Sequence, residues 1–261
     1  KISDVFEDLN SVISIDFRKT YLNNESYLRN LNGNIEFKKN KLIKSSIKSN
    51  FNNGQILNFS VSKNEKGEKV TTLFSGNAKP IIDKYKFIKG FSEGELDFYS
   101  IEKNNESKSK LKIVDFRLQE LPILTKILTL ASLKGIADLL AGEGIGFNEF
   151  EMDFISKNNL MTIEEIYAIG PAISILMDGY VEKGKLVSLR GTLVPATTLN
   201  KVIGSIPLLG DILVGKKTGE GVFGVSFKIK GHPKDLKTTV NPIKTLTPRF
   251  ITRTLEKIKK N

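Results

Sequence analysis

The stretch QILNFSV, from Gln55 to Val61, alternates apolar and polar side chains. Leu57 and Phe59 occupy alternate positions in this stretch, and the polar Asn58 lies between them. Successive side chains of a β-strand point to opposite faces of the sheet. The stretch therefore predicts a strand with one apolar face and one polar face.

The same alternation recurs along the chain, and turn-forming dipeptides ending in glycine separate the segments that carry it. These dipeptides lie at 32–33, 53–54, 66–67 and 93–94. Further alternating segments span 94–100, 147–155, 159–169, 172–182, 185–194, 220–230 and 236–240. No strand–helix–strand alternation appears, so the pattern favours an antiparallel sheet built from hairpins.

Short helices are predicted between some of the strands. Residues 77–88 carry a proline near their start, and residues 195–202 begin at one, so each predicts a short helix. Residues 121–141 are apolar at helical spacing and long enough to cross a bilayer. Three charged side chains argue against a membrane span, because each is costly inside the hydrocarbon. Gly135 predicts a break into two short helices instead.

A basic amphipathic helix is predicted from Thr247 onward, with Pro248 as its first residue. The apolar residues of this segment share one helical face, and its basic residues line another. The basic residues are Arg249, Arg253, Lys257 and Lys260. Such a helix suits an anionic membrane surface or an acidic partner, and equally a docked terminal helix with a solvated basic side.

Composition narrows the classes of function. The chain has 261 residues, with 40 Lys and Arg against 29 Asp and Glu, and a formal net charge of +11. This excess suggests anionic partners, or simply a lysine-rich composition. The basic residues are dispersed and form no aromatic–basic motif, which argues against nucleic acid. With no cysteine and a single histidine, His232, we expect neither an enzyme nor a bound cofactor.

Two local patterns are weak evidence for a phosphate-binding or cation-binding site. Residues 142–146 are rich in glycine, but they lack the lysine of a phosphate-binding loop and precede a strand. Glu149, Glu151 and Asp153 share one face of a predicted strand and could hold a cation, although a solvated face is the commoner outcome. Neither pattern predicts catalysis.

One-faced apolar strands outnumber the helices that could cover them. Two sheets packed face to face would cover these strands. A strongly curved single sheet would instead form an apolar groove that solvates acyl chains, since each buried methylene contributes about 0.8 kcal/mol. The residues alone leave both arrangements open.

The second half of the chain carries a series of short motifs in a characteristic order. They are LPILTKIL at 121–128, ASLKG at 131–135, LLAGEGI at 139–145, LRGTLVPA at 189–196, IPLLG at 206–210, GEGVFGV at 219–225 and VNP at 240–242. In order and spacing these motifs resemble the C-terminal region of the AsmA-like family, in its YhdP-like branch. The resemblance covers somewhat over half of the chain.

The resemblance implies a segment of a repeating β-groove lipid-transfer protein. The expected fold is mainly β with inserted short helices, and its strongly curved antiparallel sheet forms a U-shaped apolar groove. Residues 1–116 are expected to form strand repeats of the groove wall. Residues 117–261 are expected to form the family's C-terminal region, with helical insertions and the basic amphipathic helix.

The resemblance also implies a role and a place. The segment would belong to a longer periplasmic protein anchored in the inner membrane, and it would carry phospholipid between the inner and outer membranes. Its expected partners are phospholipid, the inner leaflet of the outer membrane and other envelope proteins. The alternative is a structural factor in outer-membrane biogenesis whose strand edges bind client β-strands.

Two sets of candidate site residues follow. The one-faced strands and the resemblance predict that acyl chains contact Leu57, Phe59, Phe98, Phe154, Leu189, Phe223, Val225 and Phe227. The resemblance places an apolar loop and the terminal helix near the end of the groove. The residues there that we expect to contact a membrane are Leu208, Leu209, Ile212, Leu213, Arg249, Phe250, Arg253 and Lys257.

Overall fold

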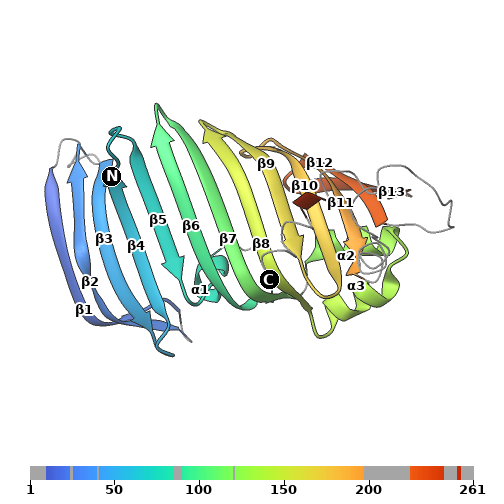
Figure 1. Cartoon of the computed structure of the whole chain (residues 1–261), viewed down its shortest axis with the longest axis horizontal. Helices are drawn as coiled ribbons and strands as arrows, with labels where there is room; N and C mark the ends of the chain where they lie inside the picture. The colour runs from blue at the N-terminus through green and yellow to red at the C-terminus, as the bar shows by residue number, and fades with distance from the viewer. Residues whose placement is uncertain are drawn as a thin grey trace.

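The chain forms one open antiparallel sheet of 13 strands, which follow one another in chain order (Figure 1). The structure is a computed structural model, and it describes residues 10–23, 26–39, 41–84, 90–119, 121–196, 224–243 and 252–253. The mainly β fold and the curved antiparallel sheet predicted from the sequence are confirmed.

Each strand pairs only with its neighbours in the sequence. The strands are β1 (Ser11–Tyr21), β2 (Tyr27–Lys38), β3 (Lys41–Phe51), β4 (Ile56–Lys63), β5 (Lys69–Ser75), β6 (Ser92–Lys103), β7 (Glu106–Leu118), β8 (Ile145–Lys157), β9 (Leu160–Ile169), β10 (Ile173–Glu182), β11 (Leu186–Pro195), β12 (Gly224–His232) and β13 (Asp235–Ile243). The helices are α1 (Lys79–Ile82), between β5 and β6, and α2 (Pro122–Leu130) and α3 (Lys134–Ala141), between β7 and β8.

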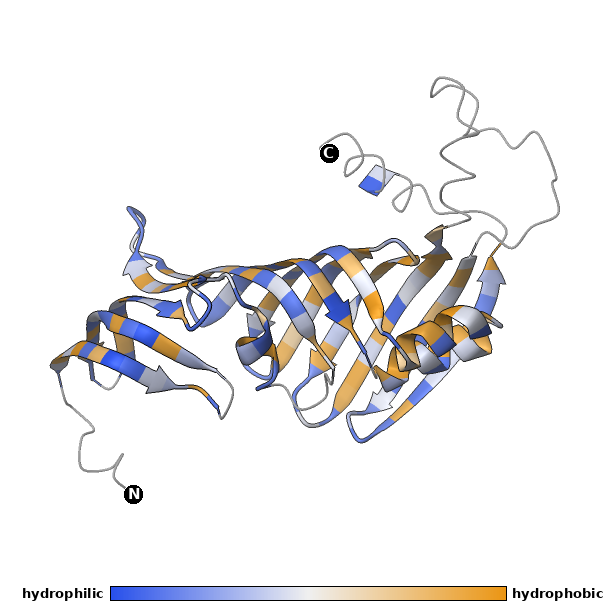
Figure 2. Ribbon diagram, turned by 90° about the horizontal axis from the view of Figure 1, so that it is seen from below, coloured by the Kyte–Doolittle hydropathy of each residue, from blue (hydrophilic) through white to orange (hydrophobic). Residues whose placement is uncertain are grey.

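The C-terminal half of the sheet is strongly curled, and α2 and α3 lie against its concave side (Figure 2). Helix α2 follows β7 and packs against β13. In a flat sheet these two strands would be about 29 Å apart. The 9 residues of α2 are only about 13 Å long. The sheet must therefore bend back on itself between β7 and β13, as a U-shaped groove requires.

The main hydrophobic core lies where the helices meet the curled sheet. Leu124, Ile127 and Leu128 of α2 and Leu140 of α3 are buried there. The sheet residues that meet them include Leu96, Ile113, Phe116, Phe147, Ala168, Ile173, Ile175, Leu193, Val225 and Phe227. This core covers one end of the strands on the concave side and leaves the other end without a described helix.

Some predicted helix boundaries are wrong. The helix expected over 77–88 is the single turn of α1, and residues 85–89 lie outside the described residues. The segment 121–141 does form two short helices, but the break falls at Ser132, whose φ is 59°. Gly135 lies in the first turn of α3, where a glycine is tolerated.

Pro195 ends a strand instead of opening a helix. It is the last residue of β11 and is opposed to Ile173 of β10. A strand end suits proline because no further ladder N–H is needed there. Ala196 is helical, while residues 197–202 and most of the predicted C-terminal helix lie outside the described residues; Thr252 and Arg253 are helical.

The predicted division of the chain at 116/117 falls inside β7, and β7 pairs with β8 along its length. The sheet therefore continues across this position without a break. Among the described residues, none of the helices combines the length and the apolar character that a membrane crossing requires.

Candidate lipid-binding face

One row of residues crosses all 13 strands of the sheet without a polar side chain. Directly opposed residues of antiparallel strands point to the same face, so successive opposed pairs trace a row. The row consists of Ile15, Gly33, Ile47, Phe59, Leu73, Phe98, Leu111, Met152, Ile166, Met177, Gly191, Phe227 and Val240. We call it the apolar row, and its side of the sheet the inner face.

The apolar row is long. Its 13 strands are spaced about 4.8 Å apart, which gives a row of roughly 58 Å. Because it runs across the strands, it follows the long axis of the sheet in Figure 1. It is therefore a continuous apolar track from one edge of the sheet to the other.

The predicted acyl-chain residues that the structure describes all lie on the inner face. Three belong to the apolar row, and the others are two positions from it along their strands, which keeps them on the same face. They are Phe59, Phe98 and Phe227 in the row, Leu57 and Val225 on the side toward α2, and Phe154 and Leu189 on the other side. Phe223 lies outside the described residues. Contact with lipid itself stays a prediction.

Most of the apolar row is missing from the set predicted by sequence. The missed side chains are Ile15, Ile47, Leu73, Leu111, Met152, Ile166, Met177 and Val240. Alternation within each strand indicates which residues share a face. It does not indicate which residues of neighbouring strands are opposed, because bulges and loop geometry set the register.

Curvature buries much of the inner face even where the sheet is a single layer. Val61 is 2% exposed, whereas Tyr99, on the opposite face of nearby β6, is 44% exposed. Side chains on a concave face converge, so they cover one another. The inner face is thus a concave surface, and the apolar row runs along its whole length.

The opposite face, which we call the outer face, carries ion pairs. Lys112 Nζ lies 3.3 Å from Glu149 Oε1, and Lys110 Nζ lies 3.7 Å from Glu151 Oε2. Lys110 also lies 3.9 Å from Asp153 Oδ1. The three acids predicted to share a face of β8 therefore do so, and lysines of β7 neutralise them. Among the described residues, no group of three or more acids and histidines is placed to hold a metal ion.

Arg253 binds the outer face from the C-terminal segment. Its Nη2 donates to Glu151 Oε2 at 2.6 Å, and its Nε donates to Glu165 Oε1 at 2.5 Å. Its guanidinium carbon lies 5.6 Å from the centre of the Tyr167 ring. Burial acts to lower the pKa of Arg253, but the hydrogen bonds and charges of Glu165 and Glu151 outweigh burial and raise it.

Arg253 is the described member of the predicted membrane-contact set, and acids of its own chain neutralise its charge. The structure thus directs this side chain to the sheet. The other members lie outside the described residues: Leu208, Leu209, Ile212, Leu213, Arg249, Phe250 and Lys257.

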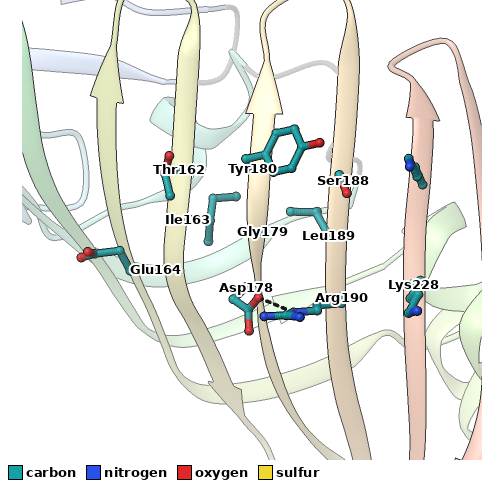
Figure 3. A pocket seen from close by; sticks show the side chains of 11 residues that line it. Thr162, Ile163, Glu164, Asp178, Gly179, Tyr180, Ser188, Leu189, Arg190 and Lys228 are labelled. Carbon is teal, nitrogen blue, oxygen red and sulfur yellow. Dashed lines mark hydrogen bonds and ion pairs between the residues drawn. The ribbon is translucent and has the colours of Figure 1, made fainter.

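An open cavity of about 700 Å³ lies over β9 to β12, lined mainly by side chains of the outer face (Figure 3). Arg190 Nε donates to Asp178 Oδ1 at 2.8 Å within it. Tyr180 and Lys228 lie beside this pair. The described lining residues include no hydrogen-bonded pair of a nucleophile and a base, so the cavity offers no catalytic arrangement of that kind.

The inner face is therefore the strongest candidate site in the described part of the chain. Comparison of the chain with family models, with curated proteins and with solved structures finds no match in any of the three.

Proposed function

We propose that this chain is a lipid-binding segment of an envelope protein and that it carries phospholipid between the inner and outer membranes. The acyl chains lie along the inner face. The observation that carries the proposal is the apolar row, which crosses every strand without a polar side chain.

The apolar row suits movement as well as binding. A lipid that shifts by one strand, about 4.8 Å, exchanges one set of apolar contacts for a similar set. No step along the row places a polar side chain against an acyl chain. The row is roughly 58 Å long, about twice the hydrocarbon thickness of a bilayer, which is about 30 Å. The inner face is therefore long enough for more than one lipid.

The mechanism uses no catalytic group, nucleotide or metal of this segment. Burial of apolar surface holds the lipid, and neighbouring strands offer equivalent sites. Direction comes from a difference in lipid supply between the two ends, or from other parts of the envelope system. The same proposal places the segment in the periplasm. It makes the segment part of a longer protein that is anchored in the inner membrane and contacts the outer membrane.

A photocrosslinking experiment tests lipid contact directly. Phe98 and Tyr99 are adjacent aromatic residues of β6, and they point to the inner and outer faces respectively. A photoreactive benzoylphenylalanine at Phe98 should crosslink to phospholipid in cells, with the adduct identified by mass spectrometry. The same group at Tyr99 is the matched control and should give no lipid adduct.

The pattern of adducts shows whether phospholipid binds the inner face. Lipid adducts at Phe98 alone support the proposal. Adducts at neither position, or equal adducts at both, would reject the inner face as the lipid site.

A role in assembly is the second candidate, and edge strand β1 favours it. Val12, Ile13, Phe17 and Tyr21 of β1 are all exposed. Apolar side chains beside unpaired backbone groups are typical of an edge that accepts another strand. Changing Val12 and Ser14, whose side chains lie on the outer face of β1, to Lys should abolish binding of an added strand peptide while leaving lipid adducts at Phe98 intact. Retained peptide binding in this variant would reject β1 as the edge that accepts a client strand.

A further inference from the structure

The inner face changes polarity along β6 and β7, whereas β3 and β5 also carry a serine, Ser49 and Ser75, on the α2 side of the apolar row. In β6, from the α2 side outward, alternate residues are Leu96, Phe98, Ser100 and Glu102. Leu96 and Ser100 are about 14 Å apart along the strand. That span is close to the hydrocarbon depth of one bilayer leaflet, about 15 Å. An acyl chain placed along the strand would thus reach from the helix-covered end to the first hydroxyl.

Hydroxyl groups form a patch beside the apolar row. Ser45, Thr71, Ser100 and Ser109 occupy the next row toward the far hairpins, with Val61 between the first two. We call these four residues the hydroxyl patch. In β9 to β12 the same row has no hydroxyl side chain, so the patch is local to β3–β7.

The hydroxyl patch has unused hydrogen-bonding capacity. Ser45 is 3% exposed, and its Oγ has no hydrogen-bond partner among the described residues. The buried Ser109 Oγ donates to Ser100 Oγ at 2.9 Å, which leaves the Ser100 hydroxyl free to donate. A buried hydroxyl without a partner is unfavourable, so a polar group of a ligand on this face would relieve a cost.

Lysines line the hairpins beyond the hydroxyl patch. The β2–β3, β4–β5, β6–β7, β8–β9, β10–β11 and β12–β13 hairpins lie at one end of the strands, and each has at least one lysine in its turn or at a strand end beside it. At the opposite end, the turns of the β3–β4 and β9–β10 hairpins have none. The tight hairpin turns therefore carry lysines mainly at one end of the strands, although acids share several of them, and the longer β5–β6 and β7–β8 connections at the other end also carry lysines.

Lys63 is the lysine best placed to receive an anion. It is directly opposed to Lys69, and like charges in that position repel. Lys69 is neutralised by Glu102. Lys63 is exposed and makes no ion pair with any described residue. An anionic group beside Lys63 would relieve the repulsion.

We propose that the hydroxyl patch and Lys63 bind the phosphate-bearing head group of an anionic phospholipid, with its acyl chains on the apolar row and their ends toward α2. The inference rests on the proposed function and adds an orientation and a head-group class. Lys63 pairs with the phosphate, and the hydroxyls donate to phosphate or ester oxygens.

A pair of lipids that differ only in the head group tests this orientation. Dioleoylphosphatidylglycerol and dioleoylglycerol share acyl chains, but only the first has a phosphate. The variant combines Ser45→Ala, Ser100→Ala and Lys63→Gln. Its control combines Ser46→Ala, Ser60→Ala and Lys48→Gln on the outer face of β3 and β4. Dissociation constants are measured in detergent micelles after circular dichroism has verified folding.

The variant should bind phosphatidylglycerol about tenfold more weakly, because hydrogen bonds to a charged group are typically worth this factor or more. Its affinity for dioleoylglycerol, and both affinities of the control, should not change. If the triple variant does not fold, Lys63→Gln alone, in an exposed position, should show the same selectivity to a smaller degree.

The failures are distinguishable. Unchanged phosphatidylglycerol binding, or equal weakening for both lipids, would overturn the head-group site. A wild-type chain that binds both lipids equally would overturn it too, and leave the lipid conduit in place. A wild-type chain that binds neither lipid would overturn the proposed function and the head-group site together.

Discussion

Gly191 lies in the apolar row and has no room for a side chain. A Cβ there would lie 2.5 Å from Phe227 Cζ and 2.6 Å from the Leu176 carbonyl oxygen. The Phe227 ring thus occupies the space that a side chain at Gly191 would need. Gly191→Val should lower the free energy of unfolding by about 1–3 kcal/mol through overpacking. Urea denaturation followed by circular dichroism measures the change.

Gly146 provides the control, because a Cβ at this position would meet no atom within 4 Å. Gly146→Ala should leave the midpoint of urea unfolding nearly unchanged. Equal destabilisation by Gly191→Val and Gly146→Ala would show that the ring of Phe227 does not depend on the glycine beneath it.

Two arginines of the outer face predict very different costs of substitution. The side chain of Arg253 is 20% exposed and binds two carboxylates, whereas that of Arg190 is 74% exposed and binds one. Arg253→Met leaves Glu151 and Glu165 close together in a partly buried place. It should cost about 2 kcal/mol, between the values for exposed and buried ion pairs.

Arg190→Met is the matched change and should cost about 1 kcal/mol or less. Thermal unfolding at low and high salt separates the two, since only exposed pairs weaken strongly with salt. A larger loss for Arg190→Met than for Arg253→Met would contradict the assignment of Arg253 as the anchor of the C-terminal segment.

Helix α2 holds the curled end of the sheet together through one face. Leu128 is fully buried against the sheet, whereas Leu130, two residues later at the end of α2, is exposed. Leu128→Ala should destabilise the fold by about 2–5 kcal/mol, because it leaves a cavity between α2 and the strands. Leu130→Ala should change stability by less than about 0.5 kcal/mol. Similar costs for both would mean that α2 does not support the curl.

Many strands were predictable from the sequence because their alternation is local, although two of the predicted turn dipeptides, 32–33 and 93–94, lie inside β2 and β6. The segment 172–182 alternates clearly, and β10 runs from Ile173 to Glu182. The apolar row was not predictable in the same way. Between β8 and β9 the register shifts at Asp153/Phe154, so two residues of β9 oppose one of β8 there. No local pattern reveals such a bulge.

Arg253 was unpredictable for a related reason. The sequence indicates a basic helical face, which suits a membrane as well as a protein partner. Its actual partners are Glu151, 102 residues earlier, and Glu165, 88 residues earlier. Only tertiary structure brings these groups together. Local periodicity therefore predicts helices and strands. Long-range contacts decide which of their charged side chains are already paired within the chain.

The whole molecule behaves as a linear array, because each strand contacts mainly its neighbours in the sequence. Such arrays unfold locally and from their ends. No described strand pairs with the outer edge of β1, which has exposed apolar residues, whereas β8 has two partners and contributes to the main core. Amide hydrogen exchange should therefore be complete in β1 long before it begins in β8.

The other end of the sheet is the internal control. Strand β13 also has one unpaired edge, but α2 packs against it. Exchange in β13 should be slower than in β1, as mass spectrometry of peptides from both strands would measure. A single exchange rate throughout the sheet would indicate one cooperative unit and contradict a linear array.

Strict chain-order pairing also gives this architecture an easy way to change in length during evolution. Duplication or loss of one hairpin adds or removes two adjacent strands, and every other pairing stays as it was. Each such event alters the reach of the apolar row by about 10 Å, two strand spacings. The direction of every other strand is preserved as well, since a whole hairpin returns the chain to the same end of the strands. Homologous sheets should thus differ by even numbers of strands.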